Sequence, residues 1–134
     1  MGQPMTLFDV AQRGMSAQLI RMNAAASNLA NAGSISGSEA QTYRPIRAVF
    51  AEDLDKATGL ASVKVQGVVR ENAAAIRQHN PDHPLADANG DVWQTPVDEN
   101  AEMVEMLESS RQYQNVVEAM QTAKQLMLET MRMK

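Results

Sequence analysis

Two histidines are the side chains whose spacing comes closest to a catalytic or metal-binding pattern. His79 and His83 lie four residues apart, and on a helix this spacing would place both imidazoles on one face, where they could bind zinc. However, Pro81 lies between them and Pro84 follows, and proline is disfavoured inside a helix. We therefore interpret both as solvated loop histidines. An enzyme that uses them with a metal is the rival hypothesis, and a metal-content measurement tests it.

A second candidate is the run of oxygen-bearing side chains Asp87, Asn89 and Asp91, which alternate as at the start of a calcium-binding loop. Such a loop needs glycine at its sixth position and glutamate at its twelfth. Val92 and Asp98 occupy those positions here. The run is instead typical of an Asn-Gly turn that leads into a short apolar strand.

The composition argues against most other chemistry. The chain has no cysteine, and therefore no disulfide, thiolate metal site or cysteine nucleophile. It contains no glycine-rich phosphate loop, nucleophile elbow or paired-carboxylate arrangement. The net charge is −4, and no basic block is available to bind phosphates. We predict a non-enzymatic protein with no cofactor, no metal, no small-molecule substrate and no nucleic-acid partner.

Two long helices at the ends of the chain are the strongest structural signal. The first is predicted over residues 7–31, because Thr6 and Asp9 form a capping pattern and Gly33 follows as a left-handed stop. The second is predicted over residues 98–132, with glutamates in its first turns and basic residues near its end, as the helix dipole favours. Each helix carries an apolar stripe that repeats every seven residues: Phe8, Met15, Met22 and Leu29 in the first, and Met106, Tyr113, Met120 and Met127 in the second.

The lengths of these helices favour an elongated molecule. The second helix would be about 50 Å long, whereas a compact globule of 134 residues is about 36 Å across. All ten methionines lie in the terminal segments, and methionine suits a surface that must adapt to several neighbours. We predict that the apolar stripes contact other chains. The alternative is that they form the ordinary core of a helical hairpin.

The region between the helices is predicted to be small and β-rich. Residues 63–65 and 68–69 have the character of strands, residues 43–50 cannot be assigned, and the Asn-Gly turn predicts a hairpin. We therefore predict a mainly α, elongated fold whose long N- and C-terminal helices pair as a coiled coil. The helical region would comprise residues 1–33 and 97–134, and the β-hairpin-rich middle subdomain residues 34–96.

Motifs in both helices resemble those of a known family. Residues 14–18 (GMSAQ), 21–23 (RMN) and 26–32 (ASNLANA) are similar to the N-terminal motif of the bacterial flagellar rod, hook and filament-type axial proteins. Residues 110–118 (SRQYQNVVE) resemble the C-terminal partner motif of these proteins. The short length fits the rod members better than the longer hook members. One departure is residues 95–98 (TPVD), where similar rod proteins tend to carry Pro-Asn-Val before the second helix.

This resemblance implies a structural subunit of the flagellar basal-body rod. Such a subunit self-assembles through its terminal helices into the axial tube that transmits torque and surrounds the export channel. Its implied partners are other flagellar rod proteins, the basal-body membrane ring complex and copies of itself. Its implied location is the periplasmic rod, reached by type III export without a cleaved signal peptide. Residues 1–6 accordingly show no basic region or apolar run of a signal peptide.

The side chains expected at subunit contacts lie on the apolar stripes and within the two motifs. Asn28 and Asn31 could instead close the first helix, and Tyr113 could be buried against that helix. Gly14 costs about 1 kcal/mol relative to alanine in a helix interior, which indicates close approach of a neighbouring backbone. The predicted assembly interface comprises Gly14, Met15, Met22, Asn28, Leu29, Asn31, Arg111, Tyr113, Val117, Met120 and Met127.

Two other functions would use the same helices. A helical adaptor or export chaperone would be a compact oligomer in solution, and another rod protein of similar length would act at a different level of the rod. If a lone subunit buries its helix faces poorly, its ends should be loose, or paired in a non-physiological oligomer. Strong hydrogen-exchange protection of residues 15–29 and 113–131 in a dilute monomer would contradict this expectation.

Overall fold

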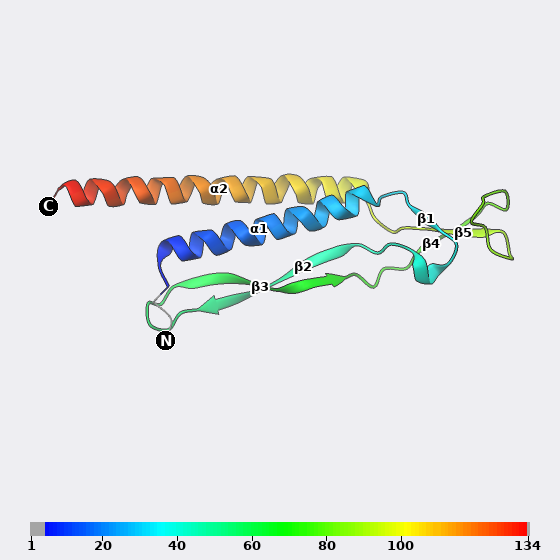
Figure 1. Ribbon diagram of the computed structural model, residues 1–134, viewed down its shortest axis with the longest axis horizontal. Helices are drawn as coiled ribbons and strands as arrows, with labels where there is room; N and C mark the ends of the chain where they lie inside the picture. The colour runs from blue at the N-terminus through cyan, green and yellow to red at the C-terminus, as the bar shows by residue number, and fades with distance from the viewer. Residues whose placement is uncertain (1–4, 134) are drawn as a thin grey trace.

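Two antiparallel helices form the long axis of the molecule (Figure 1). The computed structural model describes residues 5–133, so most of the segment searched for a signal peptide lies outside the described residues. Helix α1 spans Leu7–Ala30, helix α2 spans Glu99–Arg132, and the two pack side by side. Between them the chain forms five strands and a short 3-10 turn: β1 (Ile35–Ser36), the turn (Glu39–Gln41), β2 (Ile46–Leu54), β3 (Ala61–Arg70), β4 (Ile76–His79) and β5 (Asp91–Gln94).

The helix boundaries agree with the predicted ones to within one residue. The Thr6 hydroxyl accepts a hydrogen bond from the Asp9 amide, and the Asp9 carboxylate accepts one from the Thr6 amide, which completes a capping box. Gly33 has a φ of 77° and provides the left-handed residue that follows α1. Helix α1 therefore begins and ends where local sequence signals place it.

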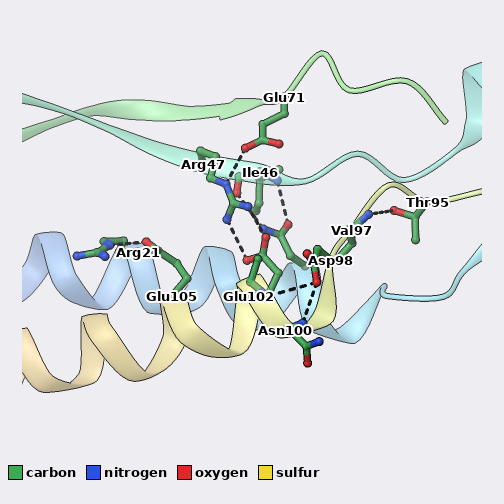
Figure 2. Close-up of polar contacts among 12 residues, drawn as sticks. Arg21, Ile46, Arg47, Glu71, Thr95, Val97, Asp98, Asn100, Glu102 and Glu105 are labelled. Atoms are coloured by element: carbon green, nitrogen blue, oxygen red, sulfur yellow. Dashed lines mark hydrogen bonds and ion pairs between the residues drawn. The ribbon is translucent and has the colours of Figure 1, made fainter. Parts of the chain in front are cut away.

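The departure at residues 95–98 does not disturb the start of α2 (Figure 2). The buried Thr95 hydroxyl donates a hydrogen bond to the carbonyl oxygen of Tyr43 at 2.7 Å. The Asp98 carboxylate accepts hydrogen bonds from two amides of the first turn, at 3.0 and 3.4 Å. Asp98 therefore caps α2 without the asparagine that similar chains carry.

The middle of the chain forms two separate antiparallel sheets. β2 and β3 make a long two-stranded ribbon that contacts α1 along its length, with a bulge between Val49 and Phe50. Residues 63–65 and 68–69 both belong to β3, so their predicted strand character is confirmed. β1, β5 and β4 make a second sheet, in that order, beyond the end of the helical pair (Figure 1). Only this second sheet stands apart from the helices.

The molecule exposes more surface than a compact domain of its size. Its accessible surface is 9202 Å², whereas a compact monomer of 14.6 kDa exposes about 6,900 Å². Within residues 5–133 the fully covered apolar side chains are few and mostly small: Ala17, Ala24, Ala25 and Val92. The elongated shape, with two long helices and a small β-rich middle, is confirmed. In the same residue range, no helix is long and apolar enough to cross a membrane.

Small residues, rather than the large apolar stripe, form the most buried face of α1. Ala17, Ala24 and Asn28 recur at helical spacing and are buried, whereas Met15 and its stripe are half-buried. A methyl group at Gly14 would lie 3.7 Å from the Val116 side chain of α2, an ordinary van der Waals distance. Within the subunit, the neighbour of Gly14 is therefore a branched side chain and not a backbone, and approach by the backbone of another subunit stays a prediction.

Candidate assembly surface

A buried ion pair joins α2 to the β2–β3 ribbon near the start of α2 (Figure 2). Glu102 is only 1% exposed, and its carboxylate accepts two hydrogen bonds from the Arg47 guanidinium, one of them at 2.9 Å. Arg47 Nε also donates to Glu71 at 2.7 Å. The bond to Glu102 raises the pKa of Arg47, although burial opposes the shift. Because a carboxylate this deeply buried requires a paired cation, Arg47 fixes the ribbon against α2.

Asn28 is fully buried and links α1 to the first residue of β2. Its Nδ2 donates to the Ile46 carbonyl oxygen at 3.0 Å. Its Oδ1 accepts hydrogen bonds from the Ile46 amide at 2.9 Å and from the Tyr43 hydroxyl at 2.8 Å. The side-chain amide is therefore used inside the subunit.

A third polar contact joins the two helices directly. Arg21 of α1 forms an ion pair with Glu105 of α2, and both side chains are partly exposed (Figure 2). The hydrogen bond from Arg21 lowers the pKa of Glu105, and the same bond raises the pKa of Arg21. Together with the contacts of Arg47 and Asn28, this pair defines the polar half of the helical pair, at the end where α2 begins.

The opposite half of the helical pair contains an open apolar groove. It lies between the first turns of α1, the part of the ribbon near the β2–β3 turn and the middle of α2, and its volume is about 710 Å³. Glu52 is its one charged lining residue. Its apolar lining residues include Phe8, Ala11, Phe50, Val63, Val116 and Met120. We call this feature the apolar groove.

Beyond the apolar groove, α2 continues without a covering element. Residues 124–133, which we call the α2 tail, are all exposed. Figure 1 shows this end of α2, coloured orange to red, extending past the start of α1. A dense cluster of exposed apolar side chains indicates a contact surface. The large apolar residues of the tail are Leu126, Met127, Leu128, Met131 and Met133.

The predicted interface residues lie in three environments. Arg111 and Met127 are exposed on α2. Asn28 and Asn31 bond within the subunit: Asn28 bonds Ile46 of β2, and Asn31 Nδ2 donates to the Ser27 carbonyl oxygen of α1 at 2.8 Å. The others are half-buried along the helical pair, and Gly14 and Met120 among them line the apolar groove: Gly14, Met15, Met22, Leu29, Tyr113, Val117 and Met120.

The residues considered as metal ligands lie in and beside the loop between β4 and β5. His79 Nδ1 bonds to the Asp91 carboxylate at 3.0 Å, and His83 Nδ1 accepts a hydrogen bond from a backbone amide two residues later. The Asp87 carboxylate accepts two amide hydrogen bonds within the turn, both at 2.9 Å, and Gly90 has a φ of 78°. The predicted turn is confirmed. Over residues 5–133, no group of three or more histidine or acidic side chains is arranged to hold a metal ion.

Two features of this surface were not found by sequence reasoning. Glu102 lies four residues before Met106 and therefore on the same side of α2, which is an unusual place for a charged residue. A charged residue on the apolar side of α2 is the sequence signal that could have identified Glu102. Its partner Arg47 is 55 positions away in the sequence, and no local pattern connects the two. The apolar groove also needs the ribbon as a wall, and the path of the ribbon along α1 is a tertiary property.

Comparison with known protein families agrees with the motifs in both helices. Residues 8–33 match the family described as "Flagella basal body rod protein". Residues 89–133 match the family described as "Flagellar basal body rod FlgEFG protein C-terminal". These segments contain nearly all of α1 and the whole of α2. The class that they define is the flagellar basal-body rod proteins.

Relatives in this class match almost the whole chain. "Flagellar basal-body rod protein FlgC" of Salmonella typhimurium is 41% identical over 127 residues, which is 95% of each chain. The protein of the same name in Escherichia coli O6:H1 is 40% identical over the same length and coverage. That of Agrobacterium fabrum is 29% identical over 122 residues, covering 90% of this chain and 88% of the relative. The chain belongs to the FlgC family of flagellar basal-body rod proteins, and it is therefore a structural subunit rather than an enzyme.

Proposed function

We propose that this chain joins the rod through the apolar surfaces of its two terminal helices, which form a coiled-coil layer around the export channel. The supporting observation is that one helical pair carries both an open apolar groove and an exposed apolar tail. Burying apolar surface stabilises an assembly by about 25 cal/mol per Å². Subunits that cover these surfaces with one another would therefore be favoured over isolated subunits.

The β-rich parts would face outward in this arrangement. Arg47 and Glu102 hold the ribbon to α2, and Asn28 holds it to α1. A rigid link of this kind suits a subunit that passes torque between its inner helices and its outer neighbours. The proposed partners are other rod proteins, copies of this chain and the basal-body membrane ring complex. The proposed location is the periplasmic rod, reached through the flagellar type III export apparatus.

The proposed interface keeps the predicted residues that the structure leaves at least partly accessible. Asn28 and Asn31 would contribute by shaping the end of α1, not by touching a neighbour. The contact residues would be Gly14, Met15, Met22, Leu29, Arg111, Tyr113, Val117, Met120 and Met127.

A matched pair of substitutions in the α2 tail tests this function. Met127→Glu places a charge on an apolar, half-exposed position, whereas Gln125→Glu places the same charge two residues away on a different face of the helix. Each full-length variant replaces the native protein in a motile bacterium, and the amount of the chain in purified basal bodies is measured. We expect Met127→Glu to lower incorporation about tenfold, and Gln125→Glu to leave it unchanged. Normal incorporation of Met127→Glu would count against the proposal.

Solution behaviour separates this function from that of a helical adaptor or export chaperone. Such an adaptor would be a compact oligomer, whereas an unassembled rod subunit should have loose helical ends. The exposed α2 tail supports the second outcome. Amide exchange of the dilute protein checks it, and strong protection throughout residues 15–29 and 113–131 would contradict it. A stable compact particle in small-angle scattering would instead support the adaptor.

A further inference from the structure

The α2 tail has a sidedness that predicts how it docks. Lys124 and Leu128 are four residues apart, as are Met127 and Met131, and the two pairs share one face of the helix. Gln125, Glu129 and Arg132 form a polar stripe to one side of this face, and the apolar Leu126 and Met133 lie on the far side of the helix. The first residue of the face that carries Met127 and Met131 is a cation, Lys124. A partner surface for this face should be an apolar trough with an anion toward one end.

The apolar groove has the matching chemistry. Its walls are apolar apart from Ser62, Asn115 and Glu52, and Glu52 is an exposed carboxylate that forms no ion pair with any residue of the described range. Lys124 likewise forms no ion pair within that range. The groove and the tail are thus complementary in both polarity and charge.

The lengths also match. The stretch of α2 that forms one wall of the groove runs from Asn115 to Ala123, and nine helical residues span about 13 Å. The ten residues of the α2 tail span about 15 Å as a helix. Two to three turns of helix would therefore lie within the groove from end to end.

The tail cannot fill the groove of its own chain. Residues 115–123 form the groove wall and continue directly into the tail as one straight helix (Figure 1). To enter its own groove the tail would have to reverse direction, which would break the helical hydrogen bonds of α2. An occupant with this sequence must come from a different molecule.

We propose that the apolar groove receives the α2 tail of a second copy of this chain, with Lys124 of the incoming helix facing Glu52. This contact joins two different surfaces, so it leaves one groove and one tail free at the ends of each pair. Contacts of this heterologous kind extend into rings or helical arrays rather than closing as dimers. The inference rests on the proposed function, and it names which two surfaces of the subunit meet.

The absence of cysteine from the chain makes a direct test possible. Two full-length variants, Ala61→Cys on the groove wall and Leu128→Cys in the tail, carry different tags and are produced together in a bacterium that lacks the native protein. Basal bodies are purified and treated with a short bis-maleimide. We expect a cross-linked product that contains both tags. In the control, Ala88→Cys in the β4–β5 loop replaces Ala61→Cys, and no such product should form.

Charge exchange sharpens the test. Glu52→Lys in the groove variant should lower the yield of the cross-link about fivefold, and Lys124→Glu in the tail variant should restore it. Glu129→Gln, in the polar stripe of the tail, should leave the yield unchanged.

The outcomes separate this inference from the proposed function. If basal bodies contain both variants but the two-tag product is absent, or the tail is cross-linked to another rod protein, the inference is overturned and the proposed function stands. If basal bodies do not contain the unsubstituted chain, the proposed function fails and the inference fails with it.

Discussion

The two halves of the helical pair are held by opposite kinds of interaction. Where α2 begins, polar side chains join the elements to one another: the buried Asn28 of α1 bonds β2, and Arg47 of β2 bonds the buried Glu102 of α2. Toward the end of α2, Arg13 of α1 still bonds Asp53 and Ser62 of the ribbon, but no polar bond within the described residues joins α2 to either of them across the apolar groove, and the α2 tail is exposed. Directional bonds with fixed partners specify one arrangement. Apolar surface is non-directional and can be covered by another molecule.

This difference teaches how one chain can be both a defined subunit and a part of a polymer. The polar half sets the angle between ribbon and helices before assembly. The apolar half leaves its groove open and its tail exposed, and in the proposed assembly neighbours cover both. The contrast predicts that substitutions in the polar half act on the stability of the subunit, whereas those in the apolar half act on assembly.

The largest expected effect comes from removing the cation of the buried ion pair. Arg47→Ala leaves the Glu102 carboxylate buried without its partner, which costs about 3–5 kcal/mol in free energy of unfolding. Urea unfolding of the purified chain measures this loss. The control is Arg13→Ala, which removes an ion pair with Asp53 whose side chains are both 45% exposed, and a hydrogen bond to Ser62, whose hydroxyl still donates to the Asp53 carbonyl oxygen. It should cost only about 1 kcal/mol.

A double substitution distinguishes an unpaired charge from a loss of packing. Arg47→Leu combined with Glu102→Leu removes both charges, and much of the lost stability should return. If Arg47→Ala is no more destabilising than Arg13→Ala, the polar half does not hold the ribbon as described.

The second largest effect is expected at Asn28. Asn28→Ala leaves the amide and carbonyl of Ile46 without their partner, and the Tyr43 hydroxyl loses one of its bonds. Leaving buried polar groups unpaired costs about 1–3 kcal/mol each, so we expect a loss of about 3 kcal/mol. Asn31→Ala is the control, because the Asn31 side chain makes one bond to the last turn of α1. Equal losses for the two variants would contradict the special role of Asn28.

The ends of the helices and the contacts of the polar half differ in how far the sequence could predict them. Both ends of α1 and the start of α2 were predictable, because Thr6, Asp9, Gly33 and Asp98 act on residues within a few positions of themselves. The turn before β5 was predictable for the same reason. Such signals are local hydrogen bonds and backbone preferences, and a sequence shows them directly.

The contacts of the polar half depend instead on where the ribbon lies. Asn28 was recognised in the N-terminal motif, but its bonds to Ile46 exist only because β2 runs beside α1. The pattern of apolar residues in β3 predicted a strand without indicating which helix would cover it. The half-buried stripes of both helices were identified, whereas the groove that they share with the ribbon required the tertiary fold.

A smaller effect is expected from acid at the contact between the two helices. The folded-state pKa of Glu105 is lowered by its bond to Arg21. Its ion pair therefore stabilises the fold above the ordinary glutamate value, near 4.5, and this contribution is lost as the pH falls through the lowered pKa. Because both side chains are partly exposed, the contribution is at most about 1 kcal/mol.

Comparison with Glu105→Gln isolates this contribution. At pH 7 the variant should be less stable than the native chain by up to about 1 kcal/mol, and the difference should be smaller at a pH near 3, which lies below the ordinary glutamate pKa. Denaturant titrations at both pH values measure it. A difference that is the same at both pH values would show that the charge of Glu105 does not contribute.

The smallest effect on stability is expected in the α2 tail, and it is the most informative for the comparison. Leu128 is 48% exposed, so Leu128→Ala should change the free energy of unfolding by less than about 0.5 kcal/mol in the dilute protein. Val92→Ala, at a fully buried position of β5, removes apolar contacts inside the subunit and should cost about 2 kcal/mol. In purified basal bodies the order should reverse, with Leu128→Ala reducing incorporation more than Val92→Ala, because in the proposed assembly Leu128 faces a neighbour and Val92 does not. If Leu128→Ala destabilises the dilute chain as much as Val92→Ala does, the tail packs within the subunit, and the division between a self-sufficient polar half and an incomplete apolar half is wrong.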